Sequence, residues 1–175
     1  MKNSIYILLA IIITLLGCTN SSDSETLLNG QYIEKNKEGI VKTIGNFINN
    51  ERDGLFVYFD NRGKLQAQEN YKNNKLHGEQ ITLHNTGKVK SLINYVNGEK
   101  NGSYTKYYKT GKQQETGSYL NDNKNGEIIW YYDNGEKNIL YTYKEGVLNG
   151  PTKIFSKEGD ITEEGNYSNG QKINN

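Results

Sequence analysis

The chain has 175 residues, enough for one ordinary domain, and its mean hydropathy of −0.83 is low. It holds 19 glycines and 14 tyrosines but few aliphatic residues, a balance that argues against a thick two-layer core and favours a thin sheet covered by large amphipathic side chains. Basic and acidic side chains are nearly equal, 21 against 20, and are interleaved, so we expect no nucleic-acid partner.

The first 17 residues form a separate segment. Lys2 precedes a short apolar stretch from Ile5 to Leu16, and Leu-Leu-Gly-Cys ends at Cys18. About 12 apolar residues are too few for a helix that crosses roughly 30 Å of hydrocarbon, which weakens the alternative of a transmembrane anchor. The segment resembles a bacterial lipoprotein signal, so residues 1–17 are expected to be a signal peptide.

That resemblance implies that Cys18 becomes the first residue of the mature protein and carries lipid, such as palmitate. Each buried CH₂ contributes about 0.8 kcal/mol, so two or more acyl chains would hold the protein durably on a membrane. We therefore expect the protein in the bacterial cell envelope, at the outer membrane if the cell is Gram-negative. The remainder of residues 18–29 is rich in Ser, Asn and Thr and is expected to be a flexible polar tether.

From residue 30 onward a glycine recurs every 24 residues. The offset of a residue is its number of positions after the leading glycine of its repeat. This regular spacing, called the glycine grid below, divides residues 30–175 into six repeats: 30–53, 54–77, 78–101, 102–125, 126–149 and 150–173. A repeat of this length predicts one small structural unit stacked on copies of itself. The leading glycines are Gly30, Gly54, Gly78, Gly102, Gly126 and Gly150.

Each repeat has the pattern of a β-hairpin. Two predicted strands of about seven or eight residues flank a first turn, such as residues 60–64 in repeat two. A second turn follows the second strand, such as Asn97-Gly98 in repeat three. An isolated hairpin is marginal in water, so the six hairpins should associate. The predicted fold is all-β, with one elongated, twisted antiparallel sheet of about 12 strands.

An aromatic residue stands at offset 17 of every repeat and is expected to be structural. Side chains two apart share a strand face, so these aromatics should join the residues at offset 11, such as Leu65, while offset 16 is polar. This alternation predicts one drier and one wetter face. The offset-17 residues are Phe47, Tyr71, Tyr95, Tyr119, Tyr143 and Tyr167.

The sequence shows no catalytic or metal-binding motif. His77 and His84 have no cysteine or clustered carboxylate at ligand spacing, so two solvated histidines are expected. There is no serine nucleophile elbow, phosphate-binding loop or dinucleotide fingerprint. We expect no catalytic residue, metal or cofactor, and no enzymatic activity.

Aromatic residues are concentrated in repeats four and five. Trp130 and Tyr132 should project to the face opposite Tyr131, and a single-layer sheet cannot bury both faces. Exposed aromatic side chains mark binding surfaces. The candidate partner-binding residues are Tyr104, Tyr108, Trp130 and Tyr132.

The repeats show a pattern of a glycine, then a Tyr or Phe, and then a turn of the form Asn-Gly-x-x-x-Gly, as in residues 95–102. This pattern resembles the bacterial variant of the MORN repeat (membrane occupation and recognition nexus) over about residues 30–173. Similar bacterial proteins are often labelled YwqK-family antitoxins of toxin–antitoxin systems. The family is otherwise associated with protein or membrane contacts and with no catalysis.

The resemblance therefore implies a non-catalytic scaffold that binds a protein partner, with a toxin neutralised at the envelope as one candidate. The alternative is a surface lipoprotein that binds a glycan, because aromatic rings can stack on sugars while Asn and Gln bind hydroxyl groups. Direct membrane contact by the repeats is a third possibility, which the near-neutral charge disfavours.

Overall fold

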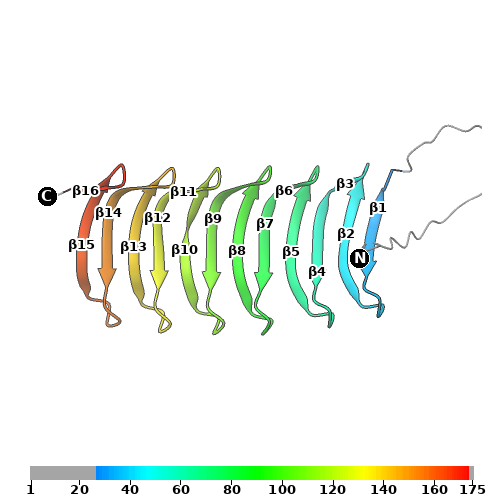
Figure 1. Cartoon of the computed structure of the whole chain (residues 1–175), viewed down its shortest axis with the longest axis horizontal. Coiled ribbons are helices and arrows are strands. Elements are labelled where there is room, and N and C mark those ends of the chain that lie inside the picture. Colours follow the sequence, from blue (N-terminus) through cyan, green and yellow to red (C-terminus); the bar gives the residue numbers. More distant parts are fainter. Residues whose placement is uncertain (1–26, 174–175) are drawn as a thin grey trace, which may run out of the picture.

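The computed structural model describes residues 27–173, and these form one open antiparallel β-sheet (Figure 1). The predicted signal peptide, Cys18 and most of the predicted tether lie outside the described residues. Within residues 27–173 there is no helix of the length and hydropathy needed to span a membrane.

The predicted fold is confirmed, because each repeat contributes two long strands that pair in chain order without a crossover. Short strands after the second turns extend this arrangement at the edge of the sheet. The long strands are β1 (Gly30–Lys35), β2 (Val41–Ile48), β4 (Gly54–Phe59), β5 (Leu65–Lys72), β7 (Gly78–Leu83), β8 (Val89–Val96), β9 (Glu99–Tyr107), β10 (Gln113–Leu120), β12 (Gly126–Tyr131), β13 (Lys137–Lys144), β14 (Val147–Phe155) and β15 (Ile161–Ser168). The short ones are β3 (Glu51–Arg52), β6 (Lys75–Leu76), β11 (Asn123–Lys124) and β16 (Gln171–Ile173).

The glycine grid reflects backbone geometry. The leading glycines have positive φ, from 84° at Gly54 to 128° at Gly150, a region in which an L side chain is strained. In the second turns two consecutive residues have positive φ, as at Asn97 (53°) and Gly98 (95°), which is the geometry of a type I′ hairpin turn.

Neighbouring repeats join in one constant register. Offsets 13 and 14 of one repeat pair with offsets 4 and 3 of the next, as in Glu115 with Trp130 and Thr116 with Ile129. The other four junctions have the same register. At the second-turn edge, the Asn50 N–H donates to Leu28 O at 3.0 Å, so Leu28 in the predicted tether is hydrogen-bonded to the first hairpin.

A β-bulge in every hairpin corrects one expectation about the faces. Offset 5 pairs with offset 11 and offset 4 with offset 13, which leaves the residue at offset 12 without a partner. In repeat two, Leu65 pairs with Phe59, whereas Tyr58 pairs with Ala67 on the face of Tyr71. The prediction that offsets 11 and 17 share a face is therefore wrong, because the extra residue reverses the alternation.

The sheet has an aromatic face, which carries offsets 2, 4, 13, 15 and 17, and an aliphatic face, which carries offsets 1, 3, 5, 11, 14 and 16. Phe56 and Tyr104, each 2% exposed, and fully buried Ile128 lie on the aromatic face. The aliphatic face has a row at offsets 3 and 14 that includes Ile33, Ile44, Val57, Ile81, Leu92, Ile129 and Leu140. Among the described residues, every buried residue except Leu140 lies on the aromatic face, so the prediction of one drier and one wetter face is confirmed, although the wetter face also carries this apolar row.

Two strand glycines outside the 24-residue spacing make room for the largest fully buried side chains, Phe56 and Ile128. Gly45 and Gly117 both stand at offset 15, beside offset 2 of the next repeat. A Cβ on Gly45 would collide with the Phe56 ring, and a Cβ on Gly117 would collide with Cδ1 of Ile128. The glycines let these side chains pack directly on the neighbouring backbone.

Candidate functional site: an aromatic pocket in repeats four and five

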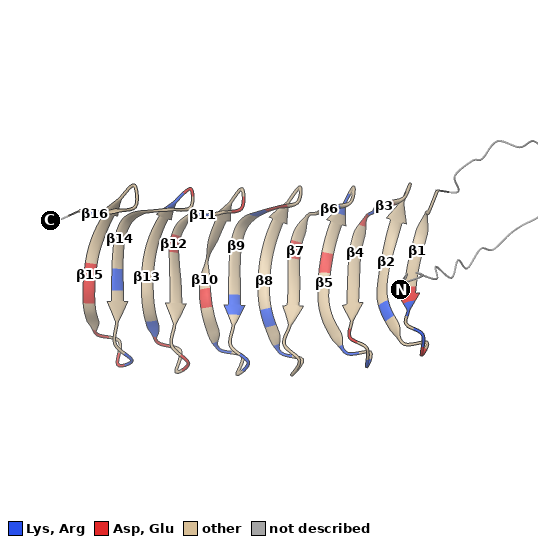
Figure 2. Cartoon of the chain, viewed as in Figure 1, with Lys and Arg blue, Asp and Glu red and all other residues tan. Residues whose placement is uncertain are grey.

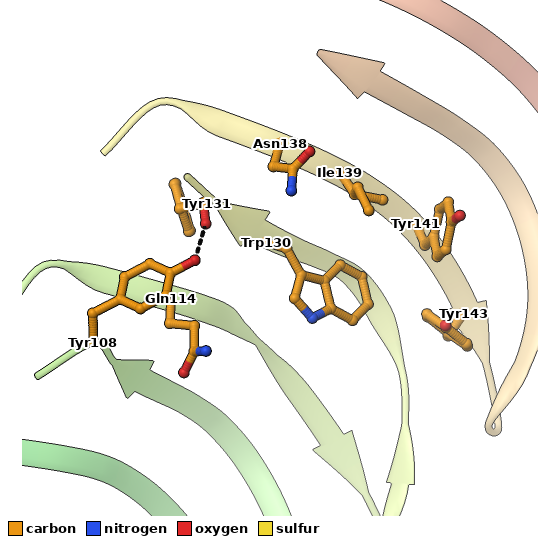
Figure 3. A pocket seen from close by; sticks show the side chains of 8 residues that line it. All are labelled: Tyr108, Gln114, Trp130, Tyr131, Asn138, Ile139, Tyr141 and Tyr143. Atoms are coloured by element: carbon orange, nitrogen blue, oxygen red, sulfur yellow. Dashed lines mark hydrogen bonds between the residues drawn. The ribbon is translucent and has the colours of Figure 1, made fainter. Parts of the chain in front are cut away.

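A cavity lined by aromatic side chains lies where β12 and β13 meet β10, on the aromatic face. It is a shallow cavity of about 260 Å³ around Trp130 (Figure 3). Trp130 reaches it because β12 places offset 4 on this face, between Glu115 of β10 and Ile139 of β13. The lining residues are Tyr108, Gln114, Trp130, Tyr131, Asn138, Ile139, Tyr141 and Tyr143.

Trp130 is half-buried and is fixed by aromatic and cationic neighbours. The centroids of its ring and the Tyr141 ring are 5.7 Å apart at an interplanar angle of 70°, an edge-to-face arrangement, and Tyr141 meets Tyr143 in the same way at 6.5 Å. The Lys124 ammonium lies 4.5 Å from the centroid of the Trp130 ring. These contacts make the pocket a preorganised apolar surface with a positive charge at its border.

Side-chain amides supply the polar part of the lining. Gln114 and Asn138 occupy offset 12, the extra residue of the β-bulge, in repeats four and five. Because a bulge re-aims its side chains, both amides reach the aromatic face beside Trp130 (Figure 3). Each amide offers donors and an acceptor to a bound molecule.

A charged network underlies the pocket on β10. Glu115 is only 5% exposed, and its carboxylate accepts hydrogen bonds from Lys106 Nζ at 2.7 Å, Lys124 Nζ at 2.8 Å and Tyr104 Oη at 2.6 Å. Burial alone would raise the pKa of Glu115, but the hydrogen bonds from the two lysines and Tyr104 together lower it. Burial and the hydrogen bond to Glu115 raise the pKa of Tyr104, so its hydroxyl remains a donor. The network thereby fixes Lys124 beside Trp130.

A second network on the same face surrounds Tyr71 and draws on repeats one, two and three. Tyr71 Oη donates to Glu69 at 2.5 Å and accepts from Arg52 Nη1 at 2.9 Å, while the Arg52 guanidinium lies 4.0 Å from the centroid of the Tyr71 ring. Glu69 also accepts a hydrogen bond from Gln80 Nε2 at 2.7 Å. Glu69 and Glu115 therefore both have specific donors on the aromatic face.

The four predicted partner-binding residues do not form one surface. Tyr108 and Trp130 both line the pocket, whereas Tyr104 is buried beside it and bound to Glu115. Tyr132 was expected to share a face with Trp130; it does not line this pocket, because β12 ends at Tyr131 and Tyr132 begins the first turn.

Tyr132 and Tyr108 belong to a row of side chains at offset 6 that joins consecutive repeats. Tyr132 Oη donates to Phe155 O at 2.7 Å, and Tyr108 Oη donates to Tyr131 O at 2.6 Å. His84 occupies the same offset, and its Nε2 lies 2.9 Å from Tyr107 O, so the prediction of a solvated His84 is wrong. These side chains stabilise the first-turn edge of the sheet.

Sequence reasoning missed Glu115, Gln114 and Asn138. The signal for the two amides was their common offset, which becomes informative only once the bulge is known. For Glu115 the signal was that Lys106 on β9 and Lys124 on β11 lie on its face of the sheet. Among residues 27–173, no group of three or more His, Cys, Asp or Glu side chains is placed to hold a metal ion.

Three segments of the chain are similar to a known family of repeats. Residues 52–73, 76–97 and 124–145 match the MORN repeat variant, and all three segments begin at the same position of the 24-residue repeat. No curated protein matches the chain. The segments correspond to the hairpins of repeats two, three and five, which are therefore similar in sequence to the MORN repeat variant.

Proposed function

We propose that this chain is a non-catalytic, membrane-anchored binding protein that contacts a protein partner through the aromatic pocket around Trp130. MORN repeats generally mediate binding or scaffolding. The observation that carries the proposal is the pocket itself: a half-buried tryptophan, neighbouring tyrosines and two amides surround a cavity of about 260 Å³. Tryptophan and tyrosine in partly enclosed sites are the side chains that contribute most to protein–protein affinity.

The lipid on Cys18 would hold this surface at the cell envelope. The lipoprotein signal in residues 1–18 supports the anchor. An exported chain fits a partner that acts at the envelope better than a toxin of the cytoplasm. The antitoxin-like function that we propose is therefore an immunity-type role against a toxin that acts at the envelope.

The test is capture of a partner from envelope extract by the purified repeats. Trp130→Ala should abolish capture, and because Trp130 is half-buried, capture is measured well below the thermal unfolding transition of the variant. Tyr132→Ala is unsuitable as a second change, since it removes a hydrogen bond between repeats. The matched control is Phe59→Ala, which removes an aromatic ring from the aliphatic face of repeat two. Capture by the Trp130 variant at the wild-type level would refute the proposed site.

A glycan is the second candidate ligand, and the amides favour it. Gln114 and Asn138 lie beside the Trp130 ring, an arrangement that suits a pyranose stacked on the indole with its hydroxyl groups bound by the amides. Binding to immobilised glycans that is lost in both Trp130→Ala and Gln114→Ala would support this ligand. A glycan array without signal, together with capture of a protein, would exclude it.

A further inference from the structure

The C-terminal edge of the sheet has the features of an unfilled repeat junction. We propose that β15 is a docking site for one extended strand of a protein partner, in which a large apolar residue is followed two positions later by Lys or Arg. This site is separate from the pocket around Trp130 and does not depend on it.

The backbone of β15 is paired on one side along its length and on the other side only in part. β14 covers one side, whereas β16 pairs only with Asn166, Tyr167 and Ser168. In the described part of the chain no strand pairs with the outer side of residues 161–165 (Figure 1). An open strand edge is a template for an added strand.

The five internal junctions predict the register of that strand. In each of them offsets 13 and 14 pair with offsets 4 and 3 of the following strand. Offsets 13 and 14 of repeat six are Glu163 and Glu164. A docked strand in the same register would place its offset-4 residue beside Glu163 and its offset-2 residue beside Gly165.

Gly165 provides space for the apolar residue. It stands at offset 15, as do Gly45 and Gly117, and those two glycines receive the large offset-2 side chains Phe56 and Ile128 from the next strand. A Cβ on Gly165 would instead meet Cε of Lys172 at 3.1 Å and Oγ1 of Thr152 at 3.4 Å. The space beside Gly165 is thus bordered by the end of a movable lysine side chain.

The Glu163 carboxylate favours a basic residue at offset 4 of the docked strand. At the same offset, Glu115 binds two lysines, Lys106 from offset 4 and Lys124 from offset 22. Glu163 has the equivalent of the second, because Lys172 Nζ lies 3.3 Å from its carboxylate, but Ile154 stands at offset 4. The Glu163 side chain remains 60% exposed, and Figure 2 shows this acidic segment on β15. A Lys or Arg on the added strand would supply a second cation.

A second copy of the chain is a poorer occupant. Its edge strand β1 would bring Tyr32 to Gly165, which fits, but it would bring Glu34 to Glu163. Like charges placed directly opposite on neighbouring strands are destabilising. The partner is therefore a strand with a basic residue at this position.

The chain itself contains a strand with the required pattern, which serves as the probe. A fluorescent peptide with the sequence of residues 102–109, GSYTKYYK, has Tyr at offset 2 and Lys at offset 4. Fluorescence anisotropy should show saturable binding to the wild-type repeats, weakened at least about tenfold by Glu163→Lys. Glu158→Lys, the same charge change in an exposed turn, and Trp130→Ala should leave the affinity unchanged.

Reversing the charge of the peptide completes the test. The peptide with Glu in place of Lys106, the lysine at offset 4, should bind the Glu163→Lys variant more tightly than the wild type. Peptide binding should also slow amide hydrogen exchange in residues 161–165. The proposal is overturned if no saturable binding occurs, if Glu158→Lys weakens binding as much as Glu163→Lys, or if protection from exchange appears only elsewhere.

Discussion

The packing of Ile128 over Gly117 provides a quantitative test of how the sheet is held together. In Gly117→Ala the new Cβ would collide with Cδ1 of Ile128 and would lie 3.2 Å from Cε1 of Tyr104 and 3.3 Å from Glu127 O. Overpacking of this kind costs about 1–3 kcal/mol. The reduced freedom of the unfolded chain returns about 0.4–1 kcal/mol. We therefore expect a net loss of about 1–2 kcal/mol in the free energy of unfolding.

The atom in collision can be removed. Ile128→Val deletes Cδ1 and alone should cost about 0.5–1.5 kcal/mol. In the double variant the new methyl group fills part of the vacated space, so the two changes should cost less together than the sum of their separate effects, by about 1 kcal/mol. Gly165→Ala is the matched control, because it stands at the same offset without a following strand, and its effect should stay within about 0.5 kcal/mol.

Urea unfolding measures these differences, followed by circular dichroism and by the fluorescence of Trp130, the single tryptophan. Coincidence of the two transitions would justify a two-state treatment. The reasoning is refuted if Gly117→Ala is as stable as the wild type, if Ile128→Val gives no rescue, or if Gly165→Ala is equally damaging.

Three further outcomes follow from the geometry of the sheet, and a fourth follows from the sequence around Cys18. Glu115→Gln should lower the free energy of unfolding by about 2 kcal/mol at neutral pH. The lowered pKa of Glu115 contributes stability that is present above the ordinary pKa value of 4.5 and is lost as pH falls. The difference between the variant and the wild type in urea unfolding should therefore shrink in acid. The raised pKa of a tyrosine such as Tyr104 contributes stability that is present below the ordinary tyrosine pKa of 10.0 and is lost at higher pH. The unfolded fraction and the absorbance of tyrosinate should therefore rise together in alkali. Tyr132→Phe should cost about 1 kcal/mol by calorimetry, because the hydrogen bond to Phe155 O is lost. Cys18→Ser should move the protein from the membrane fraction to the soluble one on cell fractionation, and an unchanged distribution would contradict lipidation.

The sequence predicted the features that repeat and missed those that depend on the bulge. Gly54 and its equivalents marked the hairpins correctly, because positive φ is a local property of the chain. The position of Leu65 could not be predicted from strict alternation, since an extra residue at offset 12 reverses the faces.

Contacts between repeats were also beyond local reasoning. Tyr132 was expected to share a face with Trp130, but its hydrogen bond to Phe155 O in the next repeat, 23 residues away, was not predicted. Gly117 lies outside the glycine grid, and its role appears only when Ile128 is placed beside it. Such roles depend on the register between hairpins, which no single repeat contains.

Photocrosslinking from defined positions tests the central claim, that the aromatic face of repeats four and five binds the partner. A photoreactive amino acid would be placed at Gln114, which borders the pocket, or at Glu127, which is exposed on the aliphatic face of the same region. After illumination in intact cells, we predict a crosslinked product from position 114, lost when Trp130→Ala is added, and none from position 127. A product from position 127 with none from position 114 would contradict the account.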